Sequence, residues 1–113
     1  MPPQKLVDPS QFIHRIQVFR KNLSPTFFED QYQPVLVFYG KLETVKIMID
    51  EYQGYVSEIG VMRIISWYEI LNRMQRADKV LIGLERYFVM ERAVQFAPPN
   101  NLFGYIKISE NLE

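Results

Sequence analysis

Residues 35–50 contain two runs, 35–39 and 45–49, in which β-branched or aromatic residues recur at every second position. This alternation predicts one long strand. Gly40 lies near its middle, where a β-bulge or a sharp bend is expected. A long strand that bends at a glycine can contribute to both halves of a barrel. The segment therefore favours a barrel-like sheet.

The second half of this stretch also fits a helix. Leu42, Val45, Ile49 and Tyr52 recur at helical spacing. In that alternative, a short strand leads into a helix at 42–52, and the fold is an α/β sandwich.

An amphipathic helix is predicted before the long strand, over residues 11–22. His14, Gln17 and Lys21 lie on the face opposite its apolar residues. A strand over 15–19 is the competing interpretation. Residues 1–9 include three prolines and predict a flexible arm. The apolar residues of the predicted helix are Phe12, Ile16, Phe19 and Leu23.

The rest of the chain predicts further strands and one more helix. Strands are expected near 54–65, as two short strands at 55–59 and 61–65 around Gly60, and near 79–86 and 87–96. Ser66 and Glu69 have the spacing of a capping box at the start of a helix over 67–77. Residues 98–113 read as an extended tail that either pairs internally or docks on a partner. Residues 10–113 are thus expected to form one globular domain with its barrel core at 34–97.

This order of elements predicts a mainly β (α+β) fold. A long strand is followed by two strands, a helix and two more strands, which is the order of a five-stranded, OB-like antiparallel barrel. The apolar face of the helix at 67–77 would close one end of the barrel. The amphipathic helix at 11–22 would precede it.

Two short segments resemble small eukaryotic OB-fold subunits. Residues 34–43, PVLVFYGKLE, are similar to the first strand of these subunits, and VLIG at 80–83 with the strand after it is similar to their fourth and fifth strands. The class includes the smallest subunit of replication protein A and the small subunit of the telomere-capping trimer. The resemblance covers about half of the chain. It implies an assembly subunit, although the C-terminus here reads as extended where that class has a helix.

Composition favours a protein that meets other proteins. The 13 basic and 13 acidic side chains are mixed along 113 residues and cancel. A neutral chain lacks the basic footprint of a stand-alone nucleic-acid-binding protein. The absence of cysteine and of an apolar run behind the first residues favours an intracellular location, in the cytoplasm or nucleus, over secretion. No apolar run is long enough to suggest membrane contact.

The sequence offers few groups for catalysis or metal binding. His14 is the one histidine, and cysteine is absent. Zinc needs several nitrogen or sulfur ligands. No serine lies in a Gly-x-Ser-x-Gly motif, and no glycine motif would bind phosphate. We therefore expect a protein that is not an enzyme and that needs no cofactor or metal.

Two apolar segments lie outside the predicted barrel core, and a core of that size shelters both with difficulty. We predict that at least one of them contacts a protein partner, in a hetero-complex or a homo-oligomer. The candidate interface comprises Phe12, Ile16, Phe19, Leu23, Leu102, Phe103, Tyr105 and Ile106.

Exposed tyrosines beside basic side chains could also stack on single-stranded nucleic acid. The candidates for this contact are Lys46, Tyr52, Tyr55, Arg63 and Arg92. We expect it to be secondary because the net charge is zero.

Two functions are consistent with these observations. The first is a non-catalytic scaffold or interaction subunit of a larger complex that handles DNA or RNA. The second is a small structural or self-assembling β-domain of viral or phage type with no nucleic-acid role. The oligomeric state in solution separates the two.

Overall fold

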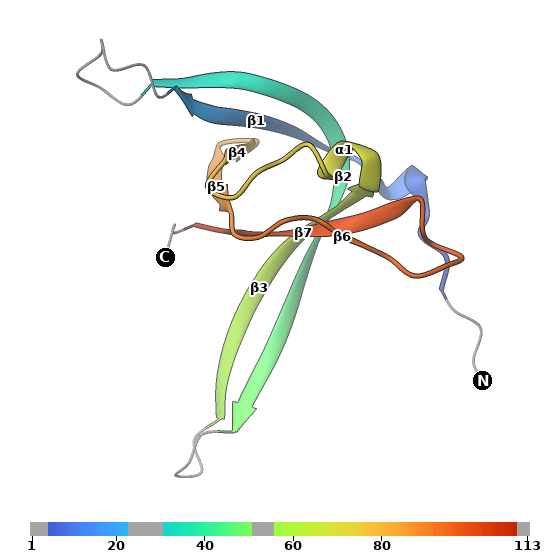
Figure 1. Ribbon diagram of the computed structural model, residues 1–113. Helices are drawn as coiled ribbons and strands as arrows, with labels where there is room; N and C mark the ends of the chain where they lie inside the picture. Colours follow the sequence, from blue (N-terminus) through green and yellow to red (C-terminus); the bar gives the residue numbers. More distant parts are fainter. Residues whose placement is uncertain (1–4, 23–30, 51–55, 111–113) are drawn as a thin grey trace.

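The computed structural model describes residues 5–22, 31–50 and 56–110. Figure 1 shows that their regular structure is almost entirely β-strand. The elements in chain order are a 3-10 turn η1 (Pro9–Gln11), β1 (His14–Asn22), β2 (Gln31–Asp50), β3 (Val56–Trp67), α1 (Tyr68–Leu71), β4 (Lys79–Ile82), β5 (Glu85–Val89), β6 (Val94–Gln95) and β7 (Phe103–Ser109).

Six of the described strands close into an antiparallel barrel. Hydrogen bonds connect them in the order β3-β2-β1-β4-β5-β7, and β7 pairs back with β3 to complete the ring. The short β6 is an addition at the edge of β7. The barrel class predicted from the sequence is confirmed. The prediction of five strands, with a core confined to 34–97, is wrong because β1 and β7 are both barrel strands.

The core lies inside this ring. Within the ring, side chains alternate between its inner and outer faces, as the pleat of a strand requires. Leu71 and Met74, from the segment after β3, join the strand residues at the core. The buried strand residues are Ile16, Val18, Phe38, Ile64, Val80, Tyr87, Val89, Ile106 and Ile108.

The predicted helix at 11–22 is wrong, because His14–Asn22 is strand β1. Ile16 and Val18 alternate with polar Arg15 and Gln17, and both apolar side chains are fully buried. β1 lies between β2 and β4 and pairs with both. These backbone hydrogen bonds across two neighbours outweigh the helical spacing of the larger apolar residues.

The long strand at 35–50 is confirmed within β2, and the alternative helix at 42–52 is excluded as far as Asp50. No bulge lies at Gly40, which pairs regularly with His14. The irregularity in the register lies between Val18 and Phe19 of β1 instead.

The helix predicted at 67–77 is reduced to the four residues of α1. Ser66 does not cap it, because the Ser66 hydroxyl donates to the Tyr39 carbonyl at 2.8 Å. Ala77 has a φ of 73°, a left-handed conformation that no α-helix continues through. The chain therefore turns after one helical turn and returns to the barrel at β4.

The C-terminal tail is an internal strand. β7 pairs with β3 over six residue pairs from Met62↔Ile108 to Trp67↔Phe103, and with β5 at Phe88 and Val89. The described residues of the predicted flexible arm are also joined to the rest of the protein, through hydrogen bonds with Asn100. The backbone N–H of Val7 donates to the Asn100 side chain at 2.9 Å, and the Asn100 amide donates to the Lys5 carbonyl at 3.0 Å. Residues 1–4 lie outside the described residues.

Candidate interaction surfaces

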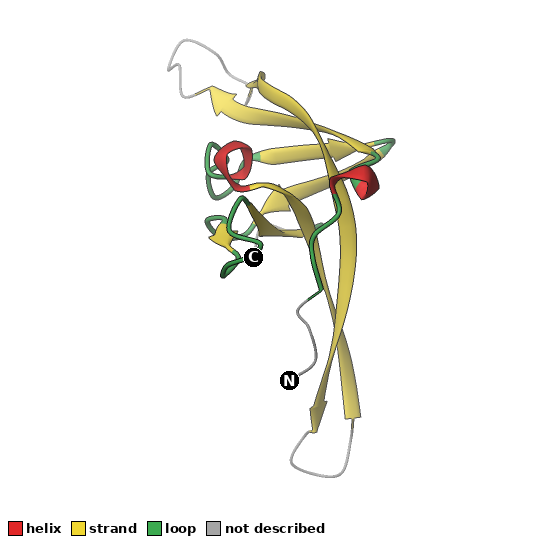
Figure 2. Ribbon diagram, turned by 90° about the vertical axis from the view of Figure 1, so that its right-hand side faces the viewer, coloured by secondary structure: helices red, strands yellow, loops and turns green. Residues whose placement is uncertain are grey.

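The far halves of β2 and β3 continue past the barrel as a two-stranded ribbon, residues 45–50 and 56–61, which Figures 1 and 2 show projecting from the body of the protein. β1 pairs with β2 only up to Gly40, and β7 pairs with β3 only from Met62. No third strand therefore borders the ribbon among the described residues. The Cα radius of gyration of 16.3 Å exceeds the roughly 13 Å of a compact domain of this length.

The register places the ribbon's residues on two different faces. Val45 is opposite Val61, and Ile47 is opposite Ile59. Because directly opposed residues share a face, one face carries Val45, Ile47, Ile49, Ser57, Ile59 and Val61. The other face carries Lys46, Met48, Asp50, Val56, Glu58 and Gly60. The first face is aliphatic except for one serine.

A second surface lies on the outer side of β1, β4, β5 and β7. Phe19 of β1 is opposite Lys79 of β4, and Lys79 is opposite Phe88 of β5. The Lys79 ammonium lies 5.1 Å from the centre of the Tyr32 ring, and the Arg86 guanidinium lies 5.9 Å from that of Phe88. We call this surface the basic–aromatic stripe, and it comprises Phe19, Tyr32, Lys79, Arg86, Phe88 and Lys107.

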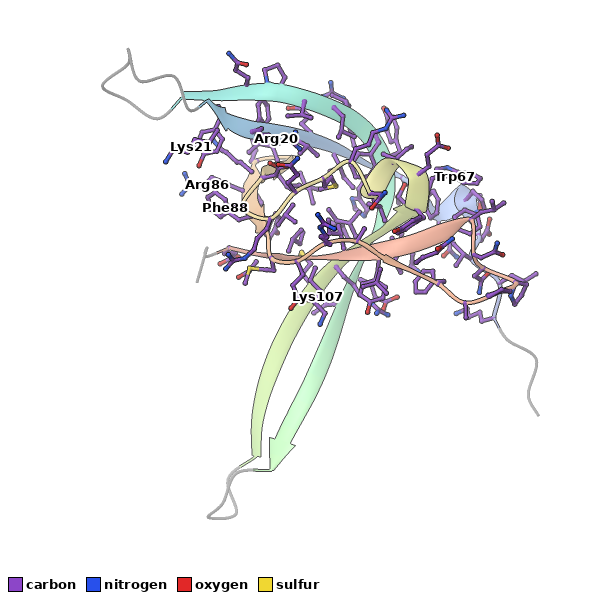
Figure 3. The ribbon with its side chains drawn as sticks, viewed as in Figure 1. Arg20, Lys21, Trp67, Arg86, Phe88 and Lys107 are labelled. Atoms are coloured by element: carbon purple, nitrogen blue, oxygen red, sulfur yellow. The ribbon has the colours of Figure 1, made fainter. Side chains whose placement is uncertain are left out.

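Figure 3 labels Arg86 and Phe88 on β5 and Lys107 on β7. Lys107 lies on β7, and its carbonyl accepts from the backbone N–H of Met90, just beyond the β5 pairing. The stripe thus runs across consecutive strands of the barrel wall and is held by backbone pairing rather than by a loop.

An ion pair beneath the stripe fixes the end of β1. Asp78 is 3% exposed, and its carboxylate accepts from Nε and Nη2 of Arg20 at 3.0 and 2.8 Å. The same carboxylate accepts from the backbone N–H of Gln75 at 2.8 Å. The hydrogen bonds to Asp78 raise the pKa of Arg20 above its usual value. This pair joins the end of β1 to the turn before β4.

Asp78→Ala is expected to lower the free energy of unfolding by about 2–3 kcal/mol. The change removes three hydrogen bonds and leaves the Arg20 guanidinium without its carboxylate. Urea denaturation followed by circular dichroism measures the loss. Glu43→Ala is the matched control, because it breaks the more exposed Arg63–Glu43 pair and should cost less than about 1 kcal/mol. Equal losses for the two variants would contradict this account.

A buried tyrosine on the inner side of β5 is also paired. The Tyr87 hydroxyl donates to Glu85 at 2.6 Å, and this bond, with burial, raises the pKa of Tyr87 to about 12. The same bond holds the Glu85 carboxylate on the side of β5 away from Arg86 and Phe88. The acid of β5 therefore lies on the opposite side of the strand from Arg86 and Phe88, which β5 contributes to the stripe.

A hollow of about 210 Å³ lies between the N-terminal segment and β2–β3, lined by Lys41, Glu43, Arg63 and Phe96 among others. Arg63 is paired with Glu43 and lies 4.6 Å from the centre of the Tyr105 ring. Among the described residues, no three His, Asp or Glu side chains gather closely enough to hold a metal ion.

The residues predicted for a partner interface do not form one surface. Ile16, Phe103 and Ile106 are buried in the protein itself. Phe12 and Trp67 pack around Phe103 with ring centres 5.8 and 4.6 Å from it. Phe19 and Tyr105 lie on the outer wall and are partly buried, Leu102 is 65% exposed in the turn before β7, and Leu23 lies outside the described residues.

The residues predicted to contact nucleic acid are also dispersed. Arg63 is on β3, and Arg92 is exposed in the segment between β5 and β6. Lys46 is in the ribbon, opposite Gly60. Tyr52 and Tyr55 lie outside the described residues. The sequence did not single out Tyr32, Lys79, Arg86, Phe88 or Lys107. The signal that could have found them is the alternation of cations and aromatics with buried residues in β4, β5 and β7.

Comparison with protein-family models gave no match, and neither did comparison with curated proteins. No helix in the described part of the chain has the length and apolar character needed to cross a membrane. The chemistry of the two surfaces is therefore the basis for inferring function.

Proposed function

We propose that this chain is a non-catalytic structural subunit that binds another protein chain through the ribbon. The observation that carries the proposal is the six-pair extension of β2 and β3 beyond the barrel, with one face made almost entirely of aliphatic residues.

A two-stranded ribbon with no partner lacks the pairing along its outer edges that a larger sheet has. An isolated two-stranded hairpin is marginally stable in water. A face of valines and isoleucines would add the cost of hydrating apolar surface wherever no partner covers it, at about 25 cal/mol per Å². Both costs are offset when the apolar face packs on a partner. The strand edges can in addition pair with a strand of that partner.

The aliphatic face of β2 extends toward the barrel. Val37 and Tyr39 follow the same alternation as Val45 and Ile47, and they are 52% and 55% exposed. The charged positions 41 and 43 separate the two apolar regions. A partner that covers this side of β2 would therefore find two apolar regions separated by a charged one.

The test is a pair of substitutions on neighbouring residues. Ile47→Lys places a charge on the aliphatic face, and Met48→Lys places the same charge on the opposite face. We expect Ile47→Lys to weaken association on the order of 100-fold and Met48→Lys to change it little. Light scattering after size-exclusion chromatography measures self-association, and binding to the isolated partner measures a hetero-complex.

A shortened chain checks that the effect is one of association. Thr44 and Met62 are opposite each other, so an Asn-Gly turn can join them in place of residues 45–61. The shortened chain should keep its cooperative melting transition and lose association. If it associates as the complete chain does, or if the complete chain stays monomeric up to about 1 mM and binds no protein, the proposal is wrong.

A further inference from the structure

Charge is distributed unevenly over the barrel although the net charge of the chain is zero. The outward positions of β1, β4, β5 and β7 carry cations on every strand and, in the described residues, no carboxylate. Glu85, the acid of β5, is on the other side with Tyr87. The outward cations are Arg15, Lys21, Lys79, Arg86 and Lys107.

From this surface we infer a second binding site, in which the basic–aromatic stripe binds single-stranded nucleic acid without sequence preference. The site does not rest on the proposed function, because it is on the barrel wall and the ribbon is outside the barrel. Sequence-independent binding to single strands uses a track of positive charge for phosphates with aromatic rings on which bases stack. The stripe provides both on adjacent strands.

Two of the three rings of the stripe have a cation over them. Lys79 is within 5.1 Å of the Tyr32 ring, and Arg86 is within 5.9 Å of the Phe88 ring. A base stacked on such a ring has its own phosphate within reach of a long, flexible cationic side chain. One ring and one cation thus form a unit that suits one nucleotide.

The spacing of the Phe19 and Phe88 rings also suits a single strand with stacked bases. Phe19 and Phe88 occupy one row across β1, β4 and β5, with Lys79 between them. Neighbouring strands are about 4.8 Å apart, so the two rings are roughly 10 Å apart. That is the length of about three stacked nucleotides at roughly 3.4 Å each. Both rings are partly buried, which holds them in place, and Arg86 must move off the face of Phe88 for a base to stack there.

Double-stranded DNA is a poorer fit for this surface. Reading the major groove requires a helix or a two-stranded arm that enters it, and the stripe is the wall of a barrel whose described α-helix has four residues. Paired bases are also stacked on each other and offer no face to Phe19 or Phe88. We therefore expect preference for single strands.

The experiment is fluorescence anisotropy with a labelled oligothymidylate of about 16 nucleotides, using the complete chain. Lys79→Gln with Arg86→Gln should weaken binding at least about tenfold and reduce the salt slope by about two. Phe88→Leu should weaken binding roughly 5- to 100-fold at all salt concentrations, since stacking on an aromatic ring is largely independent of salt.

Matched controls lie outside both the stripe and the side of β2 proposed to meet a partner. Lys5→Gln removes one exposed positive charge and Trp67→Leu removes a ring that is 39% exposed, and both should leave the affinity within about twofold. The inference is overturned if the complete chain binds no single strand, or if the controls weaken binding as much as the stripe variants do. It is also overturned if a duplex or anionic vesicles bind as tightly as the single strand and Phe88→Leu has no effect. Loss of protein association in the stripe variants, with no nucleic-acid binding at all, would assign the stripe to a protein partner instead.

Discussion

A chain that ends at Asn101 is expected to be unfolded. The deletion removes β7, which closes the barrel between β3 and β5. It also removes Phe103, Ile106 and Ile108, which are all at most 9% exposed. Losing three such side chains costs on the order of 7–15 kcal/mol. That is as much as the whole stability of a typical domain, about 5–15 kcal/mol.

Circular dichroism and the dispersion of amide proton signals in NMR measure this effect. The matched control is a chain that ends at Glu110, which keeps every residue of β7 and should melt as the complete chain does. A point substitution tests the same idea more gently. Ile106→Ala, at a fully buried position, should cost about 2–5 kcal/mol, whereas Lys107→Ala next to it should cost less than about 0.5 kcal/mol.

A chain truncated at Asn101 that still melts cooperatively would contradict the closed barrel. It would restore the sequence-based alternative in which residues 98–113 are a tail that docks on a partner.

The sequence predicted a strand correctly where the alternation was strong enough to outweigh a competing helical spacing. The stretch at 35–50 is the clearest example, because its β-branched residues have low helix propensity. The segment 11–22 failed because two patterns overlap there. Phe12, Ile16 and Phe19 have helical spacing, while Ile16 and Val18 alternate. The decision depends on β2 and β4, whose hydrogen bonds to β1 cannot be seen from local sequence.

The helix at 67–77 failed for a related reason. Its apolar spacing is helical, but Asp78 must reach both Arg20 and the Gln75 backbone, and the turn that allows this puts Ala77 in a left-handed conformation. Arg20 is 58 residues away in sequence. A contact over that separation has no local signature.

The candidate surfaces were less predictable than the fold. Both apolar segments predicted to lie outside the barrel contain barrel strands, so Ile16, Phe103 and Ile106 are inside it, whereas Phe19 and Tyr105 are on its outer wall. The ribbon was implied by the length of the strand at 35–50, but its projection follows from where β1 and β7 stop pairing. The stripe required the register of three neighbouring strands, since Phe19, Lys79 and Phe88 are far apart in sequence.

Gly104→Ala is expected to lower the free energy of unfolding by about 3 kcal/mol, and the melting temperature by roughly 10–20 °C. Gly104 is buried in β7, opposite Gln95 of β6. A Cβ atom there would lie 2.4 Å from the Val94 carbonyl oxygen and 3.0 Å from Cδ1 of Tyr68. The first contact is with backbone, so no side-chain rotation relieves it, and β6 must move away from β7.

Two further variants separate this steric cause from others. Gly83→Ala is the control for backbone conformation, because Gly83 has a φ of 62° and open space around the Cβ position. It should cost about 1 kcal/mol.

Tyr68→Ala removes only the second contact, so Tyr68→Ala combined with Gly104→Ala should not recover the stability lost by Gly104→Ala alone. Thermal unfolding by calorimetry measures all four chains. A Gly104→Ala protein within about 0.5 kcal/mol of the unmodified chain would show that β6 does not approach β7 as closely as described, because only a more distant Val94 carbonyl would leave room for the methyl group.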